Sequence, residues 1–188
     1  MSKQSYPETS AAPIPRTSRI WNGSAFETDA WNVLADDQQA VDRDYVAMSL
    51  DRWRAEKSKL QQAGAMNIAI RLAAGDVIDP ESDEIDRLAL IVLPFPKFTD
   101  GRSYSTARRL REQWGYANEL RAAGDVLIDQ IPLMARCGFT SFEITEPSTI
   151  RALERPDKAR MCRMYQSPTL HGALRRRAAL PRDLAAAE

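Results

Sequence analysis

The middle of the chain holds charged and polar residues of the types that bind small anions. Lys97 and Arg102 follow one apolar segment, and Arg121 lies at the end of the next. Such side chains beside a helix start favour an oxyanion, because free backbone amides, the helix dipole and guanidinium donors act together. Asp100 or Asp125 could then serve as acid or base. The candidate ligand or anion-binding residues are Lys97, Asp100, Arg102, Tyr104, Arg121, Asp125, Asp129 and Gln130.

The same residues also allow a structural interpretation. Asp100 and Gly101 could form a turn. Either arginine of the set could pair with Asp125 or Asp129 and thereby hold the loops together. Clustered charges indicate function only in a statistical sense. Both interpretations therefore stay open on the sequence alone.

An alternating pattern of strands and helices positions these residues. Successive parallel strands need crossover connections, so five strand-helix units predict an α/β fold with a mainly parallel sheet. The sheet could curl into a half-barrel with strands in sequential order, which we favour, or be open and doubly wound. Ligands meet such sheets at the carboxyl ends of the strands. We predict strands at 45–50, 66–73, 88–93, 118–122 and 139–145, and helices at 51–63, 80–88, 103–114, 126–136 and 147–153.

The two ends of the chain differ from this repeating core. Residues 1–18 are rich in Ser, Thr, Pro and Ala, which predicts a disordered tail. One α/β domain is expected over 19–165, beginning with a hairpin-like addition at the Asn-Gly pair of RIWNGSAF. Residues 166–188 form a basic C-terminal tail. The candidate residues for docking a partner are Trp21, Trp31, Arg175, Arg176 and Arg177, because aromatic anchors and basic runs suit protein interfaces.

The composition argues against a nucleic-acid-binding, membrane-spanning or metal-binding protein. The 188 residues are 44% apolar and carry 26 basic and 26 acidic side chains, so the net charge is zero. Without a basic field, nucleic-acid binding is not expected, and no apolar run predicts a membrane span or a signal peptide. The two cysteines form no CxxC pair, so we expect reduced thiols in a cytoplasmic protein and no metal site.

Few isolated residues suggest catalysis. His171 lies in the basic tail and is expected at the surface, while Cys137 is expected in the core. Cys162 lies in a basic segment where a reactive thiol is conceivable. The glycines form neither a dinucleotide fingerprint nor a phosphate loop, so no cofactor is evident.

Three segments carry a family resemblance: FPKFTDGRSYSTARRLRE, ELRAAGDVLIDQ and ARCGFTSFEI. They resemble a bacterial family of uncharacterised proteins labelled "oxidoreductase probably involved in sulfite reduction". The similarity is strong over Leu88 to Ile144 and continues in register from about Val46 to Gln166. Ser103 stands where the family usually has glycine, and Pro132 where it has a large apolar residue. Pro132 would fall inside the helix predicted at 126–136. We therefore expect the regular part of this helix to start near Asp129, or the helix to kink at the proline.

The resemblance implies a role in cytoplasmic sulfate assimilation, because members are typically encoded beside assimilatory sulfite reductase and adenylylsulfate or phosphoadenylylsulfate reductase. It supplies no agreed catalytic residues. Electron transfer needs a cofactor, and no cofactor motif is visible, so we expect an accessory protein that docks to sulfite reductase or its electron donor. The alternative is a small-anion-binding oxidoreductase or other enzyme of sulfur assimilation, with a flavin-binding module ranked last. Exposed sheet edges would also favour a homodimer.

Overall fold

A computed structural model describes residues 19–34, 45–62, 64, 67–97 and 99–155, in which strands and helices alternate along most of the chain. The strands are β1 (Arg19–Trp21), β2 (Phe26–Glu27), β3 (Asn32–Val33), β4 (Val46–Ser49), β5 (Ile68–Arg71), β6 (Leu90–Phe95), β7 (Glu119–Gly124) and β8 (Ser141–Ile144). The helices are α1 (Leu50–Gln62), α2 (Arg102–Glu112), α3 (Ile131–Arg136) and α4 (Pro147–Leu153), with a short 3₁₀ helix, η1 (Ile85–Arg87).

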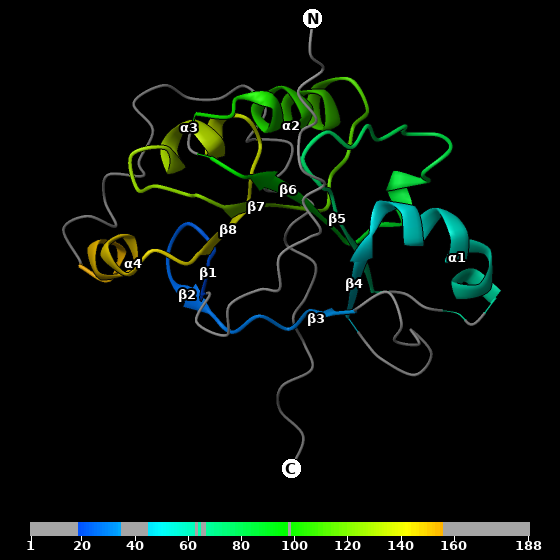
Figure 1. Cartoon of the computed structure of the whole chain (residues 1–188), viewed down its shortest axis with the longest axis horizontal. Helices are drawn as coiled ribbons and strands as arrows, with labels where there is room; N and C mark the ends of the chain where they lie inside the picture. The colour runs from blue at the N-terminus through cyan, green and yellow to red at the C-terminus, as the bar shows by residue number, and fades with distance from the viewer. Residues whose placement is uncertain (1–18, 35–44, 63, 65–66, 98, 156–188) are drawn as a thin grey trace, which may run out of the picture.

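The strands form one eight-stranded sheet in the order β2-β1-β8-β7-β6-β5-β4-β3. From β3 to β8 all neighbours are parallel and follow each other in sequence, whereas β1 runs antiparallel to both β8 and β2. Figure 1 shows the sheet curled into an arc with the helices outside it. This confirms the predicted α/β class and the half-barrel arrangement.

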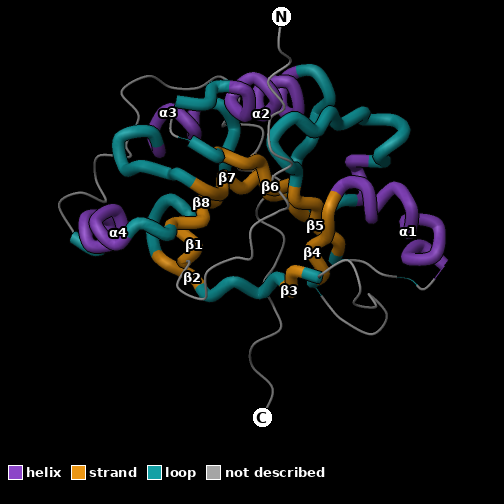
Figure 2. Tube along the Cα trace, viewed as in Figure 1, coloured by secondary structure: helices purple, strands orange, loops and turns teal. Residues whose placement is uncertain are grey.

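The N-terminal hairpin extends the arc beyond β8. Its turn is held by the Asn22 side chain, whose Oδ1 accepts hydrogen bonds from the backbone amides of Ser24 and Ala25, each at 2.9 Å. The segment 28–31 then runs from β2 to β3, across the open side of the arc (Figure 2). Two strands at opposite edges of the sheet are therefore joined by one short connection. Within the described ranges, no helix is both long and apolar enough to cross a membrane.

The two faces of the sheet differ in side-chain size, because alternate residues of a strand point to opposite sides. Large apolar side chains such as Met48, Ile70 and Leu93 belong to the main core, which they share with Trp53 and Leu110 of the helices. The concave face instead carries a small cluster of buried residues: Ala47, Ala69, Leu90, Val92 and Ala123. Small side chains leave room inside a tightly curled sheet for the polar groups described below.

The helix predicted at 80–88 is wrong. Turns occupy this region up to Glu84, which adopts a left-handed conformation with φ of 50°, and only η1 follows. The physical reason is local competition for backbone donors: the Asp79 carboxylate accepts from the amides of Glu81 and Ser82, and Asp83 accepts from the amide of Asp79. Aspartate side chains that bind nearby amides offer the backbone an alternative to a helix.

Three predicted boundaries shift for identifiable reasons. The strand expected to end at Leu93, before Pro94, continues to Phe95, because Pro94 keeps its place opposite Ala123 in the ladder with β7. The Ser49 hydroxyl accepts from the Arg52 amide at 3.3 Å, so the residue that precedes α1 caps it and Asp51 lies inside the first turn. The helix predicted at 126–136 begins only at Ile131, which is later than the regular start expected near Asp129, and Pro132 therefore lies in its first turn, where proline is tolerated.

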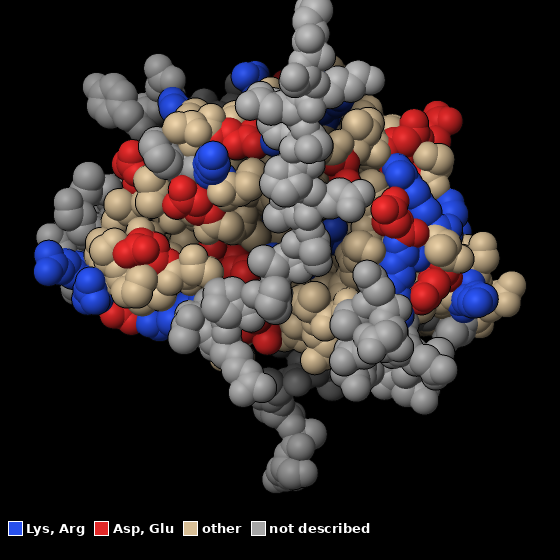
Figure 3. All heavy atoms as spheres, viewed as in Figure 1, with Lys and Arg blue, Asp and Glu red and all other residues tan. Residues whose placement is uncertain are grey.

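Asp83 ties α1 to the loop before β6. Its buried carboxylate accepts two hydrogen bonds from the Arg54 guanidinium, at 2.6 and 2.8 Å, and its carbonyl accepts from the Trp53 indole at 2.7 Å. Figure 3 shows the basic side chains over α1 lying beside acidic ones, in line with the Arg54–Asp83 and Lys57–Glu84 pairs. Burial opposes ionisation, but Arg54 and the Asp79 amide outweigh it, so the pKa of Asp83 lies below its usual range.

We predict that Asp83→Asn lowers the free energy of unfolding at pH 7 by about 2–4 kcal/mol, because Arg54 loses its buried carboxylate. A carboxyl with a depressed folded-state pKa stabilises above its unfolded-state pKa of about 4, and this stabilisation is lost as the pH falls through the folded-state value. The difference between wild type and variant should therefore shrink below about pH 4. Urea unfolding from pH 7 to pH 3 measures it.

The matched control is Asp86→Asn, which removes an exposed carboxylate from η1, and it should change stability little. Equal losses from both variants, or a difference independent of pH, would contradict the role assigned to Asp83.

Candidate functional site

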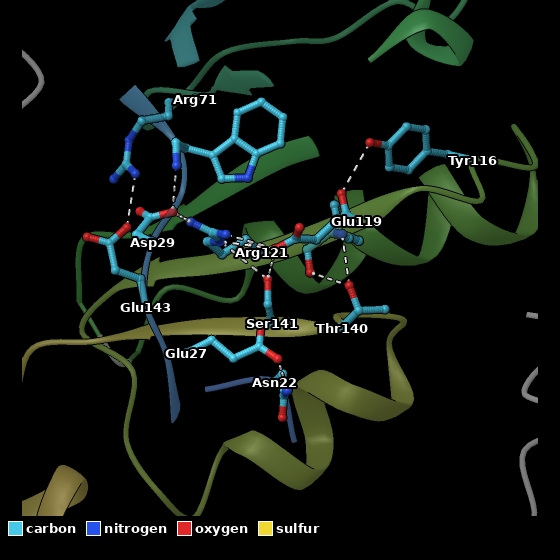
Figure 4. A network of polar contacts seen from close by, with 12 residues as sticks. Asn22, Glu27, Asp29, Arg71, Tyr116, Glu119, Arg121, Thr140, Ser141 and Glu143 are labelled. Atoms are coloured by element: carbon cyan, nitrogen blue, oxygen red, sulfur yellow. Dashed lines mark hydrogen bonds and ion pairs between the residues drawn. The ribbon is translucent and has the colours of Figure 1, made fainter. Parts of the chain in front are cut away.

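A polar network lies on the concave face of the half-barrel, where β7, β8 and the segment 28–31 meet (Figure 4). Arg121 is paired with Ser141 in the sheet register, and Glu119 lies two residues earlier on β7, so all three point inward. Arg121 donates to Glu119 Oε1 from Nη2 at 2.9 Å and to Asp29 Oδ1 from Nη1 at 3.0 Å. The Ser141 hydroxyl donates to Glu119 Oε1 at 2.5 Å. One buried cation therefore holds two carboxylates.

The charge of Arg121 is stabilised by these partners. The residue is only 4% exposed. Burial disfavours its charged form, yet the nearby carboxylates of Glu119 and Asp29 outweigh that cost, and the pKa of Arg121 lies above its usual range. Asp29 Oδ1 also accepts from the Trp31 amide at 3.2 Å. The Arg121–Asp29 pair thus fixes the closing segment against the sheet.

A second ion pair lies on the same face. Arg71 Nη1 of β5 donates to Glu143 Oε2 of β8 at 2.9 Å, across the curve of the sheet. The Glu143 side chain is 4% exposed, so its carboxylate is buried with Arg71 as its charged partner. This pair links strands that are not neighbours in the sheet order and therefore helps to hold the curl.

A cavity of about 420 Å³ opens beside Arg121. It lies near the amino ends of the parallel strands, because Tyr45 precedes β4, Thr140 precedes β8 and Glu119 begins β7. The Trp31 and Tyr45 rings line it and pack edge to face, with ring centroids 5.3 Å apart. Its lining residues are Ile20, Asn22, Glu27, Thr28, Ala30, Trp31, Tyr45, Glu119, Arg121, Thr140 and Ser141.

The sequence-predicted candidates, apart from Arg121, lie away from this cavity. Asp100 and Arg102 come together in the loop before α2, where Arg102 donates from Nη2 to Asp100 Oδ2 at 2.6 Å and from its backbone amide to Oδ1 at 3.1 Å. The bonds from Arg102 hold the pKa of Asp100 below its usual range. The Asp100 amide donates to the Lys97 carbonyl at 2.9 Å, so the turn closes at Asp100 and not at the predicted Asp100-Gly101 pair. Arg102 pairs with Asp100, and not with Asp125 or Asp129 as the structural interpretation expected.

The remaining candidates belong to the same carboxyl-end loops without joining into one network. Tyr104 packs edge-on against Phe95, and its pKa is raised by burial and, less strongly, by Cys137 and Asp129. The Asp125 amide donates to the Phe95 carbonyl at 2.7 Å. Lys97, Asp125 and Asp129 are exposed, and Gln130 occupies the N-cap position of α3 without a capping bond from its side chain. Ser103, which replaces the glycine usual in the resembled family, donates its hydroxyl to the Pro94 carbonyl at 2.5 Å.

The residues predicted to dock a partner lie in different environments. Trp21 is 2% exposed and packs against Phe26, so its ring lies in the core and offers no surface to a partner. Trp31 is half-buried beside the exposed Tyr45. The arginine run Arg175, Arg176 and Arg177 lies outside the described residues, as do His171 and Cys162.

Sequence reasoning missed the inward-facing residues Asp29, Arg71, Glu119, Ser141 and Glu143. A signal was present: Glu119 and Arg121 are two residues apart in one predicted strand, and Ser141 and Glu143 in the next. Polar side chains with a period of two in otherwise apolar strands mark one face as polar. The predicted strand 66–73 carries the same signal at Arg71. What the sequence could not supply is Asp29, which arrives from a segment far away in the chain.

No group of three or more His, Cys, Asp or Glu side chains in the described part of the chain is arranged to hold a metal ion. Cys137 is partly buried against the main core, as expected. Burial raises the pKa of its thiol, which keeps it protonated and weakly nucleophilic at neutral pH. The cavity is instead lined by carboxylates and aromatic rings, with Arg121 as a basic side chain among them.

The family described as bacterial protein of unknown function, DUF934, matches residues 69–173, which is more than half of the chain. The protein belongs to the DUF934 family. Comparison with curated proteins found no match. The matched residues of this DUF934 protein include Arg71, Glu119, Arg121 and Glu143, whereas the closing segment 28–31 precedes the match.

We predict that Arg121→Ala lowers the free energy of unfolding by about 2–4 kcal/mol, because Glu119 and Asp29 are left as partly buried carboxylates without their cation. The control is Arg102→Ala, which removes an exposed guanidinium paired with one neighbouring aspartate and should leave the melting temperature nearly unchanged. Thermal and urea unfolding of both variants measure the difference. Equal stability of the two variants would show that the Arg121 pairs do not hold the closing segment.

Proposed function

We propose that this DUF934 protein serves cytoplasmic assimilatory sulfite reduction as an accessory protein that docks to sulfite reductase or to its electron donor. The resemblance to the sulfite-reduction family is strongest over Leu88 to Ile144, a stretch that begins just before β6 and ends with β8. This stretch supplies β6, β7 and β8 and most of the polar concave face.

Docking is favoured over anion binding because both candidate arginines are already paired with carboxylates of the protein. Arg102 donates to both carboxylate oxygens of Asp100, and Arg121 already holds Glu119 and Asp29. A sulfite or phosphate ion at either guanidinium would meet the negative charges of these carboxylates at close range. The small-anion-binding oxidoreductase or enzyme therefore has less support, although it remains the alternative.

An exposed apolar group at the sheet edge suits a docking role. Val33 of β3 and Tyr45 before β4 are each 42% exposed, and Tyr45 packs against Trp31. Aromatic side chains with apolar neighbours are the residues that contribute most to binding at protein interfaces. Together these three residues, the edge patch, are the described surface that we assign to the partner.

The test is reconstitution with the sulfite reductase and electron donor of the same organism. We expect co-elution on size exclusion chromatography and a changed rate of sulfite reduction when the protein is added. The elution volume of the protein alone also reports whether it forms the expected homodimer. No association, no change in rate and normal growth on sulfate after deletion of the gene would together refute the accessory role.

A matched pair of variants localises the contact. Tyr45→Asn removes the ring while keeping a residue that tolerates the left-handed backbone at this position, where φ is 60°. It should weaken the complex by about tenfold, as expected when an interface aromatic is lost. The control Val77→Asn changes a 75% exposed side chain in the loop after β5 and should have no effect on association. Equal affinity of both variants would place the contact elsewhere.

A further inference from the structure

We propose that the cavity beside Arg121 binds an organic cation with N–H donors, that is, a primary ammonium or guanidinium group on a short hydrocarbon body. The cavity, of about 420 Å³, is of the size that small molecules occupy in proteins. Three features identify this ligand chemistry: the charge of the walls, a carboxylate oxygen with unused capacity, and a pair of aromatic rings.

The walls carry more negative than positive charge. Glu27 and Glu119 line the cavity, and Asp29, which is not among the lining residues, accepts a hydrogen bond from the Arg121 guanidinium. Against these three carboxylates stands Arg121, the one basic side chain among the lining residues. An anion would add to this surplus, whereas a cation would neutralise it.

Glu119 presents a preorganised acceptor. Its Oε1 atom accepts three hydrogen bonds, from Arg121 Nη2, Arg121 Nε and the Ser141 hydroxyl (Figure 4). Its Oε2 atom has no hydrogen-bond partner among the described residues, and the side chain is 33% exposed. The carboxylate is thus fixed in orientation through one oxygen while the other remains available to a donor in the cavity. Charge-assisted bonds of this kind are short and strong.

Trp31 and Tyr45 form the aromatic part of the wall. Both residues line the cavity, and their rings stand edge to face with an interplanar angle of 82°. Cations are attracted to the faces of such rings, and the hydrocarbon body of an amine can pack on them as well.

The experiment uses the full chain and n-butylammonium as probe, with n-butanol and butyrate as uncharged and anionic controls at equal ionic strength. Titration calorimetry gives the affinity, and the Trp31 indole resonance in ¹H–¹⁵N spectra, assigned by its loss in Trp31→Leu, gives the location. We expect saturable binding of butylammonium alone, with a shift of the Trp31 signal. Absence of binding, or equal binding of butanol, would overturn the proposal.

Two variants test the assigned atoms. Glu119→Gln keeps an acceptor for Arg121 and Ser141 but removes the charge, and it should weaken binding about tenfold or more. The control Glu112→Gln alters an exposed carboxylate at the end of α2 and should bind as wild type. Trp31→Leu should also weaken binding. Unchanged affinity of both Glu119→Gln and Trp31→Leu would show that the cation binds elsewhere and would refute the site.

The source of the cation is decided by a second probe, N-acetyl-lysine methylamide. If this blocked lysine shifts the Trp31 signal as butylammonium does, a side chain of a partner protein fits the cavity. If only the free amine binds, the ligand is a small molecule; either result supports the proposed chemistry. Because these titrations use the protein alone, their failure would leave docking to sulfite reductase untouched, and failure of docking would leave this site untouched.

Discussion

The burial of the Arg121 guanidinium is the constraint on which the curled structure depends. A buried cation is costly unless it is paired and hydrogen-bonded. Here the compensation comes from β7 itself, through Glu119, and from the segment that joins the two sheet edges, through Asp29. The electrostatics of the interior therefore add to the strand pairing of β2 and β3 in closing the half-barrel: without Asp29 the Arg121 cation is under-compensated, and without Arg121 the closing segment loses its ion pair to the sheet.

This constraint also explains the unequal faces of the sheet. The convex face is packed with large apolar side chains under the helices, as in any layered α/β protein. The concave face must hold two arginines and their carboxylates, so its other positions are small or compact, as at Ala47, Ala69 and Ala123. Hydroxyl and carboxylate partners satisfy the polar groups there, because an unpaired polar group in such a place would cost free energy.

The sequence predicted the architecture well because each strand carries its own local signal. Alternating apolar residues, Gly64 after α1 and Pro147 at the start of α4 are all short-range features. The helix expected at 80–88 failed because side-chain bonds from Asp79 and Asp83 replaced helical ones, and the long-range Arg54 contact to Asp83 cannot be inferred from spacing. The candidate site failed in a similar way. Arg121 was identified, but its partner Asp29 is 92 positions away.

The location of the cavity changes how the family resemblance should be understood. In parallel α/β sheets, ligand sites are usually expected at the carboxyl ends of the strands. The carboxyl-end residues of this protein, Asp100 and Arg102, satisfy each other in a turn, whereas the cavity opens near the amino ends and has a surplus of carboxylates. Sulfite is an anion, so this cavity would repel it. A role in sulfite reduction would then be exerted through contact with the reducing enzymes, with the cavity recognising a cationic group instead of the substrate.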